Sequence, residues 1–188
     1  GRVVPTLTGV KLGNSSLISV AFSGDGDSYA EGIEHLVHAA KRNSDIKLFV
    51  HNNQVFGLTT GQVTPTSNKG YRGKSTPNGS VEEPLNPLLI MLSSGATFVA
   101  RAYTGDLSFL TLVMKKALLH KGFAYLEIIQ PCISFNDTRA YFQERVYTMD
   151  ANLPKKDLLW AMEKVQEKEK IPLGIFYEVD KPTFEEQL

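Results

Sequence analysis

Cysteine is almost absent from this sequence, and the single one, Cys132, limits the chemistry that the chain can perform by itself. One thiol cannot form an internal disulfide, and it cannot hold a self-contained thiolate metal site or iron–sulfur cluster.

No apolar run reaches the roughly 20 residues that a membrane span needs, and the first ten residues lack the charged and apolar regions of a signal peptide. We therefore expect a cytoplasmic protein without a membrane partner.

An excess of charge is also absent, because 20 basic residues balance 20 acidic ones. No global field attracts nucleic acid, and we expect no such partner. What the chain does have is length and apolar content. With 188 residues, of which 42% are hydrophobic, it can bury the core of one globular domain, and we expect residues 1–188 to form a single domain.

Apolar runs and amphipathic segments alternate along the chain. Residues 17–22 are predicted to form a buried strand, residues 28–43 an amphipathic helix and residues 45–50 a second strand. The second half repeats the alternation, with helices near residues 87–94 and 107–120 and strands over residues 97–102 and 124–130. This order predicts an α/β fold with a mainly parallel sheet flanked by helices.

Two segments depart from this alternation. Residues 61–87 contain four glycines and four prolines with almost no periodicity, so they are predicted to be a long loop. Such loops are usually either functional lids or disordered, and both interpretations stay open here. After Asn152, a charged helix and the segment "IPLGIFYE" (171–178) form a C-terminal extension over about residues 152–188.

Acidic and glycine residues gather where the first predicted strand ends, in "FSGDGDSYAEG" (22–32). Loops that follow neighbouring parallel strands lie at the same edge of the sheet, so Asp25 is expected to approach Asn53 after the second strand. Their oxygen atoms suit Mg²⁺, which takes few protein ligands and completes its octahedron with water and phosphate. Gly24 and Gly26 lack a Cβ, which lets backbone N–H groups approach phosphate oxygens.

Other phosphate-binding motifs fit less well. The segment "GDGDSY" lacks the third glycine of G-x-G-x-x-G, and the chain has no G-K-[ST] of a P-loop. Taken alone, "GDG" is more often an ordinary turn. A second motif favours a phosphate-binding site over an ordinary turn, because Gly26 is followed after 25 residues by the pair Asn52 and Asn53.

A G-D-G followed after about 25 residues by N-N resembles the signature of thiamine diphosphate enzymes. The resemblance narrows to the β subunit of 2-oxoacid:ferredoxin oxidoreductases through residues 24–67, "QPCISFN" (130–136) and "IPLGIFYE" (171–178). It covers nearly the whole chain. It implies a thiamine diphosphate-binding fold, with the diphosphate held through Mg²⁺.

The resemblance also implies roles for particular residues. Asp25, Asn53 and the main-chain carbonyl of Val55 would ligate Mg²⁺, while Gly24 and Gly26 would line the diphosphate. A loop over the cofactor is implied for Gly57, Leu58 and Thr59. Many relatives carry a lysine where this chain has Thr60, so a role of that lysine toward the substrate carboxylate is not expected here.

The implied reaction is oxidative decarboxylation of a 2-oxoacid. The acyl group passes to coenzyme A, and the electrons pass through a [4Fe-4S] cluster to ferredoxin. Cys132 matches one of the family's four cluster cysteines, whereas the other three precede the point where this chain begins, so the chain alone cannot hold the cluster. The glutamate that activates the cofactor belongs, in the family, to the α subunit, which is therefore an implied partner.

Two alternatives stay open. The chain could be half of a thiamine diphosphate enzyme without a cluster, such as a decarboxylase or synthase, or a non-catalytic fragment or assembly module. Among the other polar residues, Glu127 is expected to be structural or paired, and His51 to end a strand. Tyr71, Arg72 and Lys74 in the long loop are candidates for contact with substrate or a partner subunit.

Overall fold

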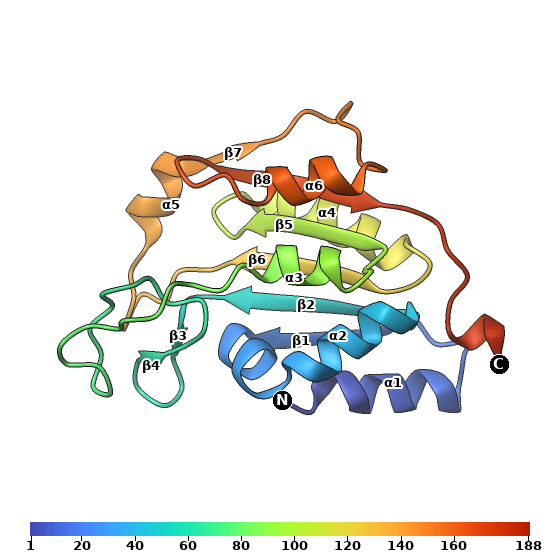
Figure 1. The fold of residues 1–188 in the computed structure, drawn as a ribbon, viewed down its shortest axis with the longest axis horizontal. Coiled ribbons are helices and arrows are strands. Elements are labelled where there is room, and N and C mark those ends of the chain that lie inside the picture. Colours follow the sequence, from blue (N-terminus) through green and yellow to red (C-terminus); the bar gives the residue numbers. More distant parts are fainter.

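A six-stranded sheet forms the centre of the molecule in the computed structural model, which describes residues 1–188 (Figure 1). The sheet has the strand order β1–β2–β6–β5–β8–β7. Its four parallel strands are β1 (Ser19–Gly24), β2 (Ile46–Asn52), β6 (Ala124–Ile129) and β5 (Phe98–Tyr103). β8 (Ile171–Glu178) runs antiparallel to β5, and the short β7 (Val146–Thr148) pairs in parallel with β8. The predicted α/β fold with a mainly parallel sheet is confirmed.

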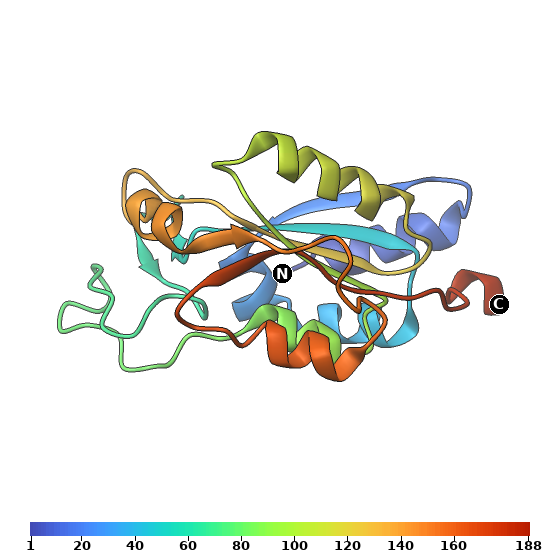
Figure 2. The same cartoon turned by 90° about the horizontal axis from the view of Figure 1, so that it is seen from above.

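Helices cover both faces of this sheet (Figures 1 and 2). One face is covered by α1 (Val3–Gly13), α2 (Ile33–Arg42), α3 (Pro87–Ser93) and α6 (Leu158–Lys164), whose apolar residues share one buried cluster. The opposite face is covered by α4 (Leu107–Leu119). Because side chains alternate along a strand, Leu48 and Val50 of β2 face the first cluster while Phe49 faces the second. A strand buried on both faces explains the continuous apolar run in the sequence.

Among the elements that were not predicted from the sequence are α1, α5 (Arg139–Arg145) and β7. The apolar residues of α1 do not form one stripe, because Val4 is buried while Val10 and Leu12 are exposed. The expected helix over residues 28–43 is also divided. Asp27–Glu31 form a π-helical turn, and α2 begins after Gly32.

The predicted long loop, residues 61–87, begins in the second strand of a small hairpin. β3 (Val55–Phe56) pairs antiparallel with β4 (Gln62–Val63), so the first residues of the loop are held beside the end of β2. Farther along, Gly70 N–H donates to Ser80 O (2.7 Å) and Ser80 N–H donates to Tyr71 O (2.9 Å), which closes the loop on itself. The loop extends beyond the carboxyl ends of the parallel strands and returns to α3 (Figure 1).

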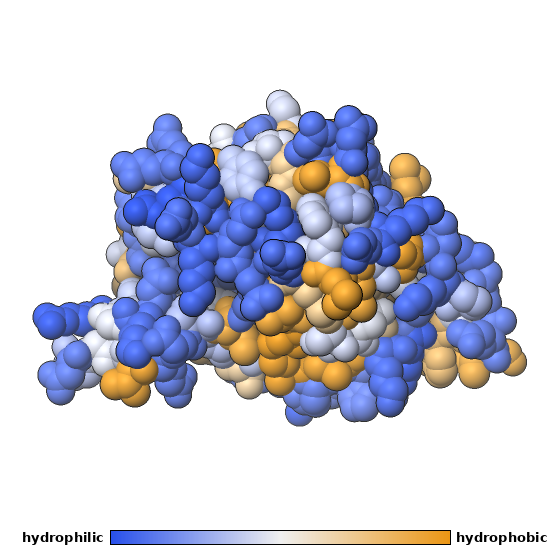
Figure 3. All heavy atoms as spheres, turned by 45° about the horizontal axis from the view of Figure 1, so that its top comes forward, coloured by the Kyte–Doolittle hydropathy of each residue, from blue (hydrophilic) through white to orange (hydrophobic).

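The C-terminal residues 152–188 contribute α6 and β8 to these same layers and end in a short 3₁₀ helix, Glu185–Gln187. None of the helices has the length and hydropathy that crossing a bilayer would require. The surface in Figure 3 is mainly hydrophilic, with a hydrophobic area near the centre of that view.

Candidate functional site

Asp25 lies just after β1 with its carboxylate buried, since the residue is 2% exposed. Its Oδ2 accepts hydrogen bonds from Thr64 Oγ1 (2.6 Å) and Thr66 Oγ1 (2.8 Å), which reach it from the segment after β4. Burial raises the pKa of Asp25 above its usual range, and the two hydroxyl donors offset only part of that rise. Backbone N–H groups of Asp25 and Gly26 also hydrogen-bond the carboxylate, but no side chain donates to Oδ1.

The glycines on either side of Asp25 have different surroundings. A Cβ placed on Gly26 would lie 2.2 Å from Cε1 of Phe56, so the turn packs directly against the β3–β4 hairpin. No atom lies within 4 Å of a Cβ placed on Gly24, so the space beside this backbone is open. Close packing therefore requires glycine at position 26, whereas no contact within the chain requires it at position 24.

Asn53 and Val55 form a tight turn after β2. Asn53 Oδ1 accepts from Val55 N–H (3.1 Å), and Gln54 between them has a left-handed φ of 63°. Asn136 Nδ2 donates to the main-chain oxygen of Asn53 (3.1 Å), which fixes this turn from the opposite side. Val55 is buried and adjoins Phe56, the residue against which Gly26 packs. The structure thus brings the turns after β1 and β2 together, as the parallel pairing predicted.

Residues 57–59 occupy the tip of the hairpin. Gly57 lies at the base, because a Cβ there would be 3.8 Å from Asn53 Nδ2 and 3.7 Å from Cys132 Sγ. Leu58 is 99% exposed, and exposed Thr59 donates to Gln62 Oε1 (2.7 Å) within the hairpin. Of the three loop residues named from the resemblance, the structure therefore places only Gly57 beside Asn53 and leaves Leu58 and Thr59 facing outward.

Cys132 is half-buried beside Gly57, next to the other candidate residues. No group of three or more His, Cys, Asp and Glu side chains converges anywhere in the chain. A lone thiol does not fit an iron–sulfur cluster, which needs four ligands. In contrast, the carboxylate, amide and carbonyl oxygens of Asp25, Asn53 and Val55 are of the kind that Mg²⁺ prefers, and they belong to the two turns that meet where Gly26 packs against Phe56.

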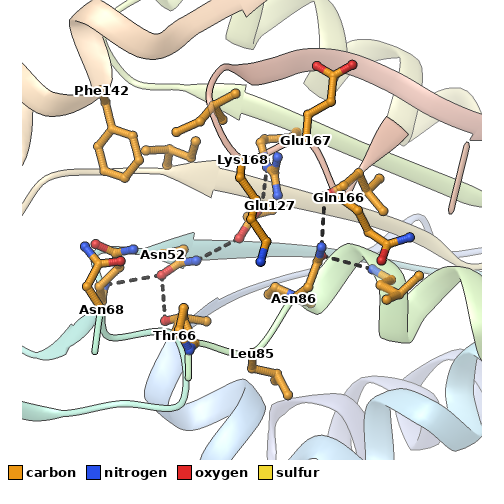
Figure 4. Close-up of a pocket in the computed structure, with 18 of the residues that line it drawn as sticks. Asn52, Thr66, Asn68, Leu85, Asn86, Glu127, Phe142, Gln166, Glu167 and Lys168 are labelled. Carbon is orange, nitrogen blue, oxygen red and sulfur yellow. Dashed lines mark hydrogen bonds and ion pairs between the residues drawn. The ribbon is translucent and has the colours of Figure 1, made fainter. Parts of the chain in front are cut away.

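A row of polar contacts crosses the sheet next to this site (Figure 4). Thr66 Oγ1 lies 2.9 Å from Asn52 Oδ1, and Asn52 Nδ2 donates to Glu127 Oε1 (2.7 Å). Arg101 Nε then donates to Glu127 Oε2 (2.6 Å), and both side chains are buried. The expectation that Glu127 is paired is confirmed. The row connects Asp25 after β1 with Arg101 on β5.

Thr64, Thr66 and Arg101 were not identified from the sequence as site residues. A local signal exists in "TPTS" (64–67), where two threonines alternate around a proline, but nothing local shows that these residues fold back onto Asp25. The return is held by Ser67, whose Oγ donates to Gln54 O (2.5 Å) and accepts from Thr64 N–H (2.8 Å).

The polar row opens on a cavity of about 460 Å³ at the carboxyl ends of the central strands. Figure 4 shows Asn52 and Thr66 on one side and Asn86 and Gln166 on the other, with Phe142 at one end. Only 7 of its 20 lining residues are hydrophobic, so polar and charged groups form most of its wall. Its position is also where α/β sheets bind ligands.

Other polar residues have local partners. His51, the penultimate residue of β2, hydrogen-bonds Gln130 through Nδ1. Tyr71 Oη donates to Gly61 O (3.1 Å), and Lys74 Nζ lies 3.3 Å from Thr60 Oγ1. The long loop is thereby placed against the hairpin tip, and its contact with a substrate or a partner protein stays a prediction.

Comparisons with known proteins agree with this geometry. Residues 1–128 match the family described as "Thiamine pyrophosphate enzyme, C-terminal TPP binding domain", and residues 132–188 match the family of the C-terminal region of the pyruvate ferredoxin oxidoreductase β subunit. The chain is 38% identical over 192 residues to a 2-oxoacid:ferredoxin oxidoreductase subunit beta of Saccharolobus solfataricus, covering 95% of this chain and 63% of that protein. It is 43% identical over 137 residues to the 2-oxoglutarate oxidoreductase subunit KorB of Mycobacterium tuberculosis, covering 73% of this chain and 37% of that protein.

A solved structure has the same fold. The 2-oxoglutarate:ferredoxin oxidoreductase from Magnetococcus marinus, with 2-oxoglutarate, coenzyme A and succinyl-CoA bound, superposes with a TM-score of 0.97 at 35% identity. The match covers 99% of this chain and 65% of that one. The chain thus spans about two thirds of the length of several of the proteins it matches.

Proposed function

Because this chain belongs to the family of 2-oxoacid:ferredoxin oxidoreductase β subunits, we propose that it holds the diphosphate end of Mg²⁺–thiamine diphosphate in such an enzyme. The observation that carries the proposal is the buried carboxylate of Asp25. One of its oxygens is fixed by Thr64 and Thr66, and the other has no side-chain donor beside the turn of Asn53 and Val55.

Three oxygen donors would hold the metal. These are the carboxylate of Asp25, the side-chain oxygen of Asn53 and the main-chain carbonyl of Val55. The remaining positions of an octahedron would be filled by diphosphate oxygens and water, as is usual for Mg²⁺. A divalent cation favours the ionised form of a nearby carboxylate, and so it would oppose the effect of burial on the pKa of Asp25.

The diphosphate would lie along the backbone of Gly24 and Gly26. The open space beside Gly24 supports this placement, since a phosphate could approach the backbone without meeting a Cβ. The hairpin tip of Gly57, Leu58 and Thr59 would cover the cofactor. In the chain alone Leu58 and Thr59 face outward, so this covering role would require the cofactor and the partner subunit to be present.

When bound, thiamine diphosphate supplies the carbanion that attacks the carbonyl of a 2-oxoacid. The part of this chain is to fix the diphosphate through the metal and thereby set the position of the reactive end. We propose a 2-oxoacid and coenzyme A as substrates and ferredoxin as electron acceptor, and the site would be completed by an α subunit. Cys132, beside Gly57, is proposed as one cluster ligand that needs three cysteines from outside these 188 residues.

Calorimetric titration with thiamine diphosphate, with and without Mg²⁺, tests the proposal. The native enzyme, purified with the subunits that accompany this chain, should bind the cofactor only with Mg²⁺. Asp25→Asn keeps the shape of the side chain but removes its charge, so Mg²⁺-dependent binding should be lost. Asp106→Asn is the matched control, because Asp106 lies after β5 at the same edge and serves as the N-cap of α4. Unchanged binding by the Asp25 variant would refute the site.

A further inference from the structure

We propose that Thr66 is a positioning residue that aims the carboxylate of Asp25 at the metal, and that Asn52, Glu127 and Arg101 hold Thr66 in place. This inference rests on the proposed function. The polar row that carries it extends from Asp25 across β2 and β6 to β5 and consists of buried side chains.

The hydrogen bonds at Asp25 are asymmetric. Thr64 and Thr66 both donate to Oδ2, and no side chain donates to Oδ1. Two donors on one oxygen fix the rotation of the carboxylate plane about the Cβ–Cγ bond. Oδ1 is thereby presented as the oxygen for a cation, and removal of either hydroxyl would leave one side-chain donor and weaken the constraint on the carboxylate plane.

The hydroxyl of Thr66 has one proton and two neighbouring acceptors, Asp25 Oδ2 at 2.8 Å and Asn52 Oδ1 at 2.9 Å. The orientation of the Asn52 amide is set by its other partners, since Nδ2 donates to Glu127 and Oδ1 accepts from Gln54 N–H (3.2 Å). Asn52 Oδ1 keeps a second lone pair for Thr66, so the one hydroxyl proton is directed between two acceptors, of which the ionised carboxylate is the stronger. The fixed amide and the carboxylate together restrict where the hydroxyl can lie.

Glu127 keeps Asn52 in this orientation only while its own carboxylate is fixed. Arg101 Nε donates to Oε2 at 2.6 Å, which leaves Oε1 for Asn52. Three strands thus support one threonine hydroxyl. This arrangement matters most for Mg²⁺, because Mg²⁺ demands near-ideal octahedral geometry whereas Ca²⁺ accepts flexible coordination. A rotated Asp25 should weaken Mg²⁺ binding more than Ca²⁺ binding.

The test measures the concentration of MgCl₂ or CaCl₂ that gives half-maximal binding of thiamine diphosphate to the native enzyme. Thr66→Val removes the donor at nearly constant shape, and it should raise the Mg²⁺ concentration about 10–100-fold and the Ca²⁺ concentration much less. Thr66→Ser restores the hydroxyl and should restore Mg²⁺ binding. Thr64→Val is a second variant that removes the other donor and should also act mainly on Mg²⁺.

Thr97→Val is the matched control. Thr97 is equally buried and donates to Asn43 Oδ1 (2.7 Å), but it precedes β5 at the opposite edge of the sheet. Removal of the Thr97 hydroxyl should leave the Mg²⁺ and Ca²⁺ concentrations for half-maximal cofactor binding unchanged. Three results would overturn the inference while wild-type binding still supports the proposed function. These are an equal rise of the Mg²⁺ and Ca²⁺ concentrations in the Thr66 and Thr64 variants, no rise of either concentration, and failure of Thr66→Ser to restore Mg²⁺ binding. Failure of the wild type to bind with Mg²⁺ would overturn both.

Discussion

The ion pair of Arg101 and Glu127 offers a direct test of the buried polar row. In Arg101→Met, the apolar stem is largely kept, but the guanidinium group is removed, which lies over the ring of Phe176 and is the only charged partner of Glu127. The carboxylate of Glu127, whose side chain is 3% exposed, would be left with the single hydrogen bond from Asn52. We expect a large loss of stability.

The magnitude follows from the burial of both partners. Removing one member of a buried ion pair typically costs about 3–5 kcal/mol, because the other charge stays buried without compensation. For a chain of this length, each kcal/mol corresponds to roughly 2–4 °C, so the melting temperature should fall by about 6–20 °C. Arg101→Met combined with Glu127→Gln leaves no unpaired charge and should recover at least about half of the loss.

Urea unfolding followed by far-UV circular dichroism measures these differences. Arg139→Met is the matched control, because Arg139 makes a similar pair with Asp137 (2.7 Å) on the surface, and its loss should not change the unfolding midpoint measurably. A loss below about 1 kcal/mol for Arg101→Met, or a double variant no more stable than the single one, would show that the pair is not held as the structure indicates.

Two further predictions concern packing and pH. Gly26→Ala places a methyl group 2.2 Å from the ring of Phe56, so it should lower the free energy of unfolding, measured with urea, by about 1–3 kcal/mol. Adding Phe56→Leu to this variant should restore part of that free energy. Burial and the nearby charge of Lys47 lower the pKa of His120 from 6.5 to about 4. Because the unfolded chain binds this proton more tightly, stability should be complete above about pH 6.5 and fall by up to about 3 kcal/mol as the pH falls to 4. His120→Gln should abolish that slope, and an unchanged slope would contradict the assignment.

The strand order of the first half and the edge where the site lies were predictable from the sequence. Both depend on local signals, namely the apolar run before Gly24, the amphipathic helix and the second apolar run before Asn52. Two parallel strands that are neighbours in the sheet necessarily place their following loops at one edge. Asp25 and the turn of Asn53 therefore could be expected to meet before any tertiary contact was known, and the structure brings their turns together.

The elements that the sequence did not predict owe their conformation to tertiary contacts. β7 has only three residues and gains its partners from β8, which comes more than twenty residues later in the chain. α1 has no single apolar face, and its position depends on packing against β1 and α2. The outward direction of Leu58 was also not predictable, because it depends on the pairing of β3 with β4.

The polar row is the clearest case in which sequence reasoning must stop. Glu127 can reach Asn52 only because β6 inserts between β2 and β5, a strand order that no local pattern contains. The register must also be correct, since a slip of one residue would turn Glu127 to the opposite face of the sheet, away from both Asn52 and Arg101. A carboxylate inside an otherwise apolar strand, "AYLEII", is costly to bury without such partners. The sequence therefore indicates that Glu127 has a partner, and only the assembled sheet shows that the partners are Arg101 and the asparagine that supports the candidate metal ligand.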